Sequence, residues 1–281
     1  MAAVSDAETI AQEVADAFAS GRTFSSPLSS REGFTLEVAY AVEAALARRR
    51  SAAGRRMVGR KVAFANAAVW RALKIETVAW ASMYDDTVQQ AAEGTRTVVP
   101  FTFAPKLEPE IVFRLKSAVD GDPTDPAAVL GAVEWLSLGY EVVDCPFENW
   151  TFQAPDLVAA FGFHANLVLG RPTYITPANA AALAGQLSTF TLTLFKNDAP
   201  VEKGGGVNVL TNPALALGEL AAAIRRTPGA RPLEAGELVT TGSLTTPPRI
   251  HPGETWRAEP RGLDVAPLTM TIEGRAPTPE P

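Results

Sequence analysis

Two glutamates separated by a single proline, Glu108 and Glu110, open an apolar run that covers residues 111–113. In a β-strand alternate side chains point to the same face, so both carboxylates would project from one side. Their oxygens are the hard ligands that a divalent cation such as Mg²⁺ prefers. At an exposed strand edge the same pair would instead only discourage pairing with another chain. The spacing therefore indicates a metal site if a third ligand lies nearby.

A third carboxylate, Glu141, lies inside the apolar segment of residues 138–143, which reads as a buried strand running into Asp144. A buried carboxylate needs a charged or hydrogen-bonded partner, because burying it alone is costly. Two acids from one strand and one from another make a suitable cage for an octahedral divalent ion. Glu108, Glu110 and Glu141 are therefore candidate metal ligands.

The elements that must position these residues change in character along the chain. Residues 1–98 are predicted to form a helical N-terminal region with short strands, because apolar residues recur at helical spacing before residue 50. Strands dominate residues 99–275, with helices expected at 126–136 and at 213–226, where Asn212 is the N-cap. Residues 276–281 are expected to be a disordered tail. The sequence therefore predicts an α+β protein.

The composition is that of an ordinary globular protein, with 47% hydrophobic and 20% charged residues among 281. A net charge of −6 argues against nucleic acid or an anionic membrane as partner. Cys145 is the only cysteine, which excludes an intrachain disulfide and cysteine-rich zinc sites. No basic and apolar leader and no apolar run of about 18 residues is present, so a cytoplasmic location is expected.

Several short motifs are found in a characteristic order. They are Gly59-Arg60-Lys61-Val62, Tyr84-Asp85-Asp86, Glu108-Pro109-Glu110, Tyr140-Glu141-Val142-Val143-Asp144, Leu167-Val168-Leu169-Gly170 and Thr241-Gly242-Ser243-Leu244. In this order and spacing the chain resembles the 2-keto-4-pentenoate hydratase and 2-oxo-3-hexenedioate decarboxylase family, within the fumarylacetoacetate hydrolase superfamily. The resemblance extends roughly from Tyr40 to the last predicted strand.

The resemblance implies a mixed β-sheet curled into an incomplete barrel of the fumarylacetoacetase C-terminal-like type. It also implies Mg²⁺ or Mn²⁺ on the three glutamates, Lys61 and Asp85 as proton-transfer residues, and Ser243 or Thr241 at the substrate carboxylate. Members act on small 2-keto acids in aromatic catabolism, and many are homo-oligomers. Near a cation and in a partly apolar pocket, Lys61 is expected to have a lowered pKa.

The expected activity is a hydratase that adds water to a 2-keto-enoic (2-hydroxydienoic) acid through a metal-stabilised enolate. A decarboxylase of a vinylogous 2-oxo-enedioic acid would use the same metal cage. A non-catalytic assembly partner of such an enzyme is a third reading, although a purely structural subunit has little reason to keep three converging carboxylates.

The chain departs from close hydratases in the segment 162–166. A serine thought to line the hydratase pocket is replaced by Phe163, and His164 lies beside it. The lysines expected after Trp150 are replaced by Thr151 and Gln153. These changes predict a different substrate length and polarity. His164 is either a new acid or base, or a packed and hydrogen-bonded histidine.

Overall fold

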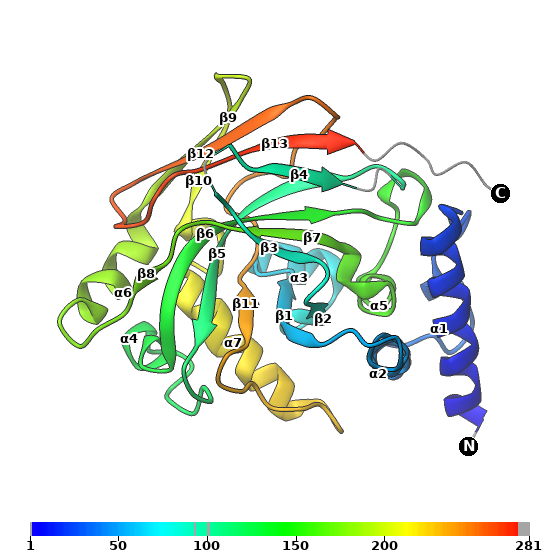
Figure 1. Cartoon of the computed structure of the whole chain (residues 1–281). Helices are drawn as coiled ribbons and strands as arrows, with labels where there is room; N and C mark the ends of the chain where they lie inside the picture. The colour runs from blue at the N-terminus through cyan, green and yellow to red at the C-terminus, as the bar shows by residue number, and fades with distance from the viewer. Residues whose placement is uncertain (1, 93, 100–101, 275–281) are drawn as a thin grey trace.

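The computed structural model describes residues 2–92, 94–99 and 102–274, and these form two β-sheets with helices around them (Figure 1). The larger sheet has the strand order β2-β1-β11-β5-β6-β7-β3, with β8 on β6, and the smaller has β10-β9-β12-β13-β4. The strands are β1 Met57–Ala63, β2 Ala79–Tyr84, β3 Val88–Gln90, β4 Arg96–Val99, β5 Lys106–Leu115, β6 Val133–Val143, β7 His164–Leu169, β8 Thr173–Tyr174, β9 Thr191–Lys196, β10 Ala199–Gly205, β11 Leu238–Thr240, β12 Thr255–Arg261 and β13 Leu268–Gly274.

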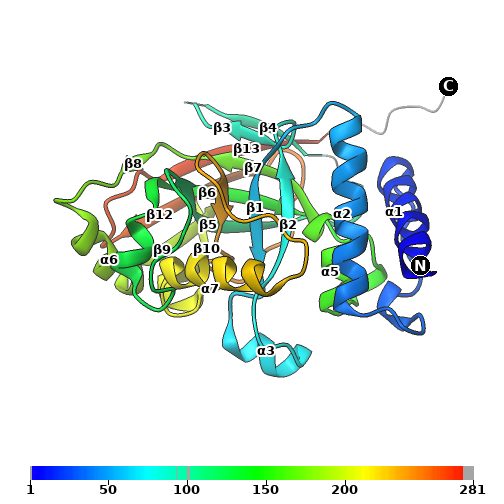
Figure 2. The ribbon, with the colours of Figure 1, turned by 90° about the horizontal axis from the view of Figure 1, so that it is seen from below.

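The helices take different places around these sheets. They are α1 Ala2–Ser20, α2 Leu36–Ala52, α3 Ala67–Leu73, α4 Pro126–Leu130, α5 Ala154–Ala159, α6 Ala180–Thr189 and α7 Pro213–Arg226, with short 3-10 turns at Leu28–Ser30, Glu148–Trp150, Phe161–Phe163 and Gly206–Asn208. Helices α1 and α2 lie side by side at one end of the molecule, and α7 crosses one side of the larger sheet (Figure 2). The α+β class and the curled, incomplete barrel expected from the sequence are confirmed.

Four adjacent strands of the larger sheet carry the predicted site. Strand β1 pairs in parallel with β11, which places Lys61 opposite Thr240. Strand β11 pairs with β5, and β5 pairs with β6 so that Glu108 lies opposite Glu141. Residues from positions 61, 108, 141 and 240 therefore meet on one stretch of sheet. The sheet also runs across the expected boundary between residues 98 and 99, since β1, β2 and β3 belong to it.

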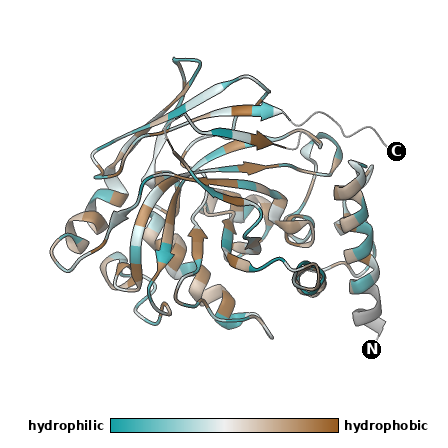
Figure 3. Ribbon diagram, in the orientation of Figure 1, coloured by the Kyte–Doolittle hydropathy of each residue, from teal (hydrophilic) through white to brown (hydrophobic). Residues whose placement is uncertain are grey.

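Glycines allow two close approaches between these strands. A Cβ on Gly59 would lie 2.0 Å from the carbonyl oxygen of Leu238, so only glycine lets β1 and β11 pair here. A Cβ on Gly139 would lie 2.5 Å from Cγ2 of Val112, inside the core. In Figure 3 many residues of the larger sheet's strands are brown, the colour of hydrophobic residues. Many residues of these strands belong to the buried hydrophobic core.

Two helix predictions have different outcomes. Helix α7 begins after Asn212, whose side chain accepts a hydrogen bond from the Ala214 amide, and it ends at Arg226 as predicted. Residues 206–226 are long and apolar enough to cross a membrane, but 61% of the most apolar 18-residue window in this stretch is buried inside the fold, as in a core helix. The helix expected at 126–136 is wrong beyond residue 130, because β6 begins at Val133 and pairs along β5. The predicted tail, 276–281, lies outside the described residues.

Candidate active site

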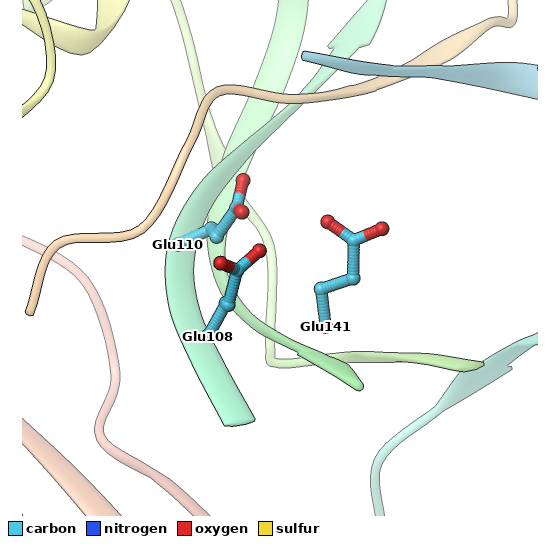
Figure 4. Close-up of side chains that lie close together, drawn as sticks. All are labelled: Glu108, Glu110 and Glu141. Atoms are coloured by element: carbon cyan, nitrogen blue, oxygen red, sulfur yellow. The ribbon is translucent and has the colours of Figure 1, made fainter. Parts of the chain in front are cut away.

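Three carboxylates converge between β5 and β6. Glu108 and Glu110 project from one face of β5 toward Glu141 on β6 (Figure 4). One oxygen from each side chain lies within 4.8 Å of the others, close enough to share one ion. The structure therefore brings together the three ligands that were predicted from strand periodicity, and the facing register of Glu108 and Glu141 accounts for their proximity.

The oxygens of these glutamates are unequally satisfied. The amide N–H of Gly242 donates to Oε2 of Glu110 at 2.6 Å. The other oxygen of Glu110 is buried and has no hydrogen-bond partner among the described residues. Glu141 accepts from the Thr240 hydroxyl at 3.4 Å and contacts Nδ1 of His164 at 2.7 Å. A buried, partnerless carboxylate oxygen is costly, and a cation in the cage would remove that cost.

Burial and mutual repulsion perturb the acidities of this cluster. Burial raises the pKa of Glu108 to about 7, against the attraction of Lys61. Burial, and then the charges of Glu141 and Glu108, raise the pKa of Glu110 well above its usual 4.5. Burial also opposes ionisation of Glu141, but Lys61 and His164 outweigh it and lower the pKa. Crowded anionic oxygens of this kind fit a hard divalent cation, with Glu108, Glu110 and Glu141 as its ligands.

Lys61 is almost completely buried beside the carboxylates. Its Nζ lies 3.3 Å from Oε1 of Glu141 and 4.0 Å from Oε2 of Glu108. Burial acts to lower the pKa of Lys61, but the glutamates outweigh it and raise the pKa above the usual 10.5. This direction holds for the protein groups alone, whereas the lowered pKa expected from the sequence presupposes a cation on the glutamates and stays a prediction.

Asp85 lies away from this cluster. It is exposed in the turn after β2, where its carboxylate accepts a hydrogen bond from the Arg56 amide and lies 3.6 Å from the Arg56 guanidinium. Ala81 is the cross-strand partner of Lys61, and Asp85 lies four residues further along, roughly 13 Å away at strand rise. Asp85 does not line the cavity that Lys61 and Glu108 border, so the structure does not bring Asp85 together with Lys61.

A cavity of about 520 Å³ opens beside the carboxylates. Lys61, Glu108, Gly242 and Ser243 line it together with several aromatic side chains, including Phe163. Ser243 is therefore placed where a substrate group could reach it, although its hydroxyl donates to the Thr245 carbonyl at 2.8 Å. Thr241 is buried and absent from this wall, and its hydroxyl donates to the Ile111 carbonyl at 2.8 Å.

His164 is a packed, hydrogen-bonded histidine behind Glu141, and it does not line the cavity. Its Nε2 lies 2.9 Å from the Thr87 hydroxyl, which itself donates to the Tyr84 carbonyl. Both ring nitrogens of His164 therefore have a hydrogen-bonding partner. Thr87 and Thr240 were not predicted from the sequence, because neither belongs to a recognisable motif and both reach the site through strand pairing.

Metal affinity is expected to depend on pH. A cation must displace the proton of Glu108, whose pKa is about 7, and that of Glu110. In the folded protein Glu108 has a pKa of about 7, whereas its ordinary value is 4.5. Protonation of Glu108 therefore contributes to the free energy of unfolding in full below pH 4.5, and this contribution is lost as the pH rises through about 7. Added Mg²⁺ should then restore stability above pH 7 and bind progressively more weakly below it. Calorimetry between pH 6 and 8 in buffers of different ionisation enthalpy measures both the affinity and the protons released. Mg²⁺ binding that releases no protons and has the same affinity at each pH would contradict this prediction.

No protein-family model matches the chain, but curated proteins do. It is 30% identical over 241 residues to the 2-hydroxyhexa-2,4-dienoate hydratase of Comamonas testosteroni, covering 84% of this chain and 87% of that protein. It is 28% identical over 258 residues to the 2-keto-4-pentenoate hydratase of Paraburkholderia xenovorans, covering 91% of each chain. It is also 26% identical over 264 residues to a 4-oxalocrotonate decarboxylase of a Pseudomonas species, covering 94% of this chain and 98% of that protein.

Solved structures share the fold. The 4-oxalocrotonate decarboxylase from Pseudomonas putida G7, complexed with magnesium and adipate, superimposes with a TM-score of 0.83 at 22% identity, covering 95% of this chain and 97% of that one. A fumarylacetoacetate hydrolase family protein from yeast superimposes with a TM-score of 0.54 at 11% identity, covering 79% of this chain and 94% of that one. The chain therefore shares its fold with a 4-oxalocrotonate decarboxylase and, at a lower TM-score, with a member of the fumarylacetoacetate hydrolase family.

Proposed function

The chain belongs to the 2-keto-4-pentenoate hydratase and 4-oxalocrotonate decarboxylase family of the fumarylacetoacetate hydrolase superfamily, and we propose that it is a divalent-metal-dependent hydratase of a 2-hydroxydienoic acid. The family consists of lyases of the meta-pathway of aromatic degradation. The observation that carries the proposal is the glutamate cage, with one oxygen of Glu110 lacking a protein partner, next to Lys61 at a cavity of substrate size.

In this hydration the glutamates would bind the metal and Lys61 would transfer protons. Mg²⁺ or Mn²⁺ held by the three glutamates would supply Lewis-acid stabilisation of the negative charge on the 2-oxo oxygen. Lys61, whose Nζ lies 3.3 Å from Oε1 of Glu141 and which lines the cavity, would donate a proton to the far carbon of the dienol as the 2-hydroxyl proton leaves to solvent, and this gives the conjugated enone. The neutral amine that remains would accept the proton of the attacking water, and solvent would return the proton lost by the 2-hydroxyl to the carbon next to the 2-oxo group.

Other groups orient the substrate. The Gly242 amide fixes the Glu110 carboxylate, and Ser243 lines the wall where the acid group of the substrate would lie. Asp85 has no place in this scheme, because its carboxylate is turned toward Arg56. Proton transfer is therefore assigned to Lys61 and water, without Asp85.

A decarboxylase of a 2-oxo-enedioic acid is the second candidate. It is favoured by the similarity to 4-oxalocrotonate decarboxylase over nearly the whole chain, and it would require the same cage. A non-catalytic assembly role is less well supported, since Lys61 and the cage both lie at a substrate-sized cavity. We further propose that the enzyme is cytoplasmic and forms homo-oligomers, as the sequence resemblance implies.

Turnover distinguishes the candidates. We expect purified protein with Mg²⁺ to consume 2-hydroxypenta-2,4-dienoate, seen as loss of dienol absorbance, and to stop when a chelator is added. Mn²⁺ should restore the activity of the chelated enzyme. Release of carbon dioxide from 2-oxo-3-hexenedioate, without dienol consumption, would support the decarboxylase instead. No reaction with either substrate would reject both lyase assignments.

A further inference from the structure

We propose that His164 is a positioning residue of the metal centre: together with Lys61 it holds one oxygen of Glu141, Oε1, and leaves Oε2 for the cation. The inference rests on the proposed function, because it takes the three glutamates as a metal site. It goes further by assigning a role to a buried side chain that does not line the cavity and is not one of the three ligands.

The two oxygens of the Glu141 carboxylate have different surroundings. Nδ1 of His164 lies 2.7 Å from Oε1, and Nζ of Lys61 lies 3.3 Å from the same atom. An ionised carboxylate only accepts hydrogen bonds, so both nitrogens donate to Oε1. Among the described residues, Oε2 has one hydrogen-bond partner, the Thr240 hydroxyl at 3.4 Å. Oε2 is therefore the oxygen with lone pairs left for a cation, and the contacts on Oε1 fix the rotation of the carboxylate.

The imidazole ring of His164 is held at both nitrogens. Its Nε2 lies 2.9 Å from the Thr87 hydroxyl, which lies 2.9 Å from the Tyr84 carbonyl oxygen. The side chain of His164 is 3% exposed, so solvent does not compete for these bonds. Partners that hold a metal-binding carboxylate in place raise the metal affinity of a site. A ring that is fixed by Thr87 would therefore fix Glu141 in the orientation that binds the cation.

The turn before His164 also packs against Lys61. Three residues in a row have positive φ, with Phe161 at 55°, Gly162 at 62° and Phe163 at 58°. This left-handed region is strained for phenylalanine, and strained residues of this kind cluster at functional sites. A Cβ on Gly162 would lie 2.8 Å from Cδ of Lys61, so the backbone of this turn touches the lysine side chain. The turn therefore positions both groups that contact Oε1.

A β-bulge between β6 and β7 aims the imidazole at the cage. Glu141 on β6 pairs with Leu167 on β7. Two residues further along β6, Val143 pairs with His164, although regular pairing would place Ala165 there. Since Glu141 and Val143 share one face of β6, regular pairing would turn His164 to the opposite face. The extra residue on β7 thus brings His164 to the face of the glutamates, as bulges near active sites do.

Lys61 and His164 contact the same oxygen, but their removal should have different effects on the metal. The Lys61 ammonium also lies 4.0 Å from Oε2 of Glu108, so it shares the cage with the cation. No hydrogen bond or ion pair joins His164 to Glu108 or Glu110, all of which the structure describes. His164 therefore orients one ligand without competing with the cation, and its loss should weaken the site.

Two amide substitutions separate the roles of the two ring nitrogens. In His164→Asn the side-chain amide takes the place of Nδ1 and can donate to Glu141, whereas in His164→Gln it takes the place of Nε2 and meets Thr87 instead. By calorimetry we expect His164→Gln to bind Mg²⁺ about 10- to 100-fold more weakly than the parent, and His164→Asn to stay within a few-fold of it. Thermal unfolding without metal shows whether each variant is folded. His251→Gln is the matched control and should bind Mg²⁺ like the parent, because His251 is the other histidine of the chain and is exposed.

The outcomes distinguish positioning from packing. Parent-like Mg²⁺ affinity in His164→Gln would overturn the inference. Equal weakening in both His164 variants would also overturn it, since both remove the ring but only one removes the hydrogen bond to Glu141. A parent protein that does not bind Mg²⁺ would reject the proposed metal centre itself, and with it this inference.

Thr87→Val gives a second test that leaves the histidine in place. Valine keeps the shape of the half-buried Thr87 but has no hydroxyl, so Nε2 of His164 loses its partner. We expect the Mg²⁺ affinity to fall about two- to tenfold, the loss expected for one hydrogen bond. Thr173→Val is the matched control, because it removes another half-buried hydroxyl, which donates to the Asp264 carbonyl at 2.9 Å. Equal Mg²⁺ affinities in Thr87→Val, Thr173→Val and the parent would overturn the inference that a fixed imidazole ring holds Glu141.

Discussion

Replacing Glu110 with glutamine should abolish Mg²⁺ binding and lower kcat/KM by about 10³-fold or more, the loss expected when several kcal/mol of metal stabilisation disappear. One oxygen of Glu110 is buried without a protein partner, and the other accepts the Gly242 amide. A glutamine would keep the Gly242 hydrogen bond but turn an NH₂ group, with its two donor hydrogens, toward the cage. That group repels a cation where the carboxylate would bind it.

The same substitution should stabilise the folded chain when no metal is added. Burial and the charges of Glu141 and Glu108 raise the pKa of Glu110, so its ionisation disfavours folding near neutrality. Glutamine removes that effect, and the thermal midpoint should rise while metal binding is lost. Glu134→Gln is the matched control, because Glu134 lies on β6 in a surface ion pair with Arg114. It should retain both Mg²⁺ binding and turnover.

Calorimetric titration of Mg²⁺ into both variants, together with thermal unfolding, separates loss of a ligand from loss of structure. Unchanged Mg²⁺ affinity in Glu110→Gln would remove Glu110 from the cage, and with it the proposed metal centre. A fall in stability of Glu110→Gln would instead show that the ionised carboxylate supports the fold.

Local periodicity was enough to predict the carboxylate cage. Glu108 and Glu110 alternate along one strand, and Glu141 interrupts an otherwise apolar strand, so each is conspicuous in the sequence alone. The family and fold also followed from motif order, because short motifs at fixed spacing define a common scaffold. The register that sets Glu108 opposite Glu141 was not predictable, since pairing between two strands depends on the whole sheet.

Pairing between strands that are far apart in the sequence determines where Lys61, Asp85 and His164 lie relative to the glutamates. Lys61 reaches the cage only because β1 pairs with β11, almost 180 residues later, as the register of Lys61 with Thr240 shows. The same strand order carries Asp85 to an exposed turn, although it follows Lys61 closely in the motif order. His164 lies behind Glu141 because β7 pairs with β6, and there it is buried and hydrogen-bonded, as the second of its two readings expects.

Replacing Lys61 with methionine should separate proton transfer from metal binding. Turnover is expected to fall by about 10²- to 10⁴-fold, the usual contribution of a general acid or base. Mg²⁺ affinity should stay the same or increase, because the Lys61 ammonium lies 3.3 Å from Glu141 and 4.0 Å from Glu108 and competes for their charge. Methionine has a similar length and fits a buried position, so the cavity should keep its shape.

Lys61→Met should lower the stability of the metal-free protein, whereas Glu110→Gln should raise it. Without the lysine, the three carboxylates face one another without the Lys61 ammonium between them, so the variant should unfold more readily in chelator. Mg²⁺ should then raise its thermal midpoint by more than it raises that of the parent, since binding stabilises by mass action. Lys116→Met, at an exposed position just after β5, is the matched control and should change neither property. Turnover within a few-fold of the parent would reject Lys61 as the proton donor, whereas loss of Mg²⁺ affinity would show that Lys61 is needed to hold the glutamates in place.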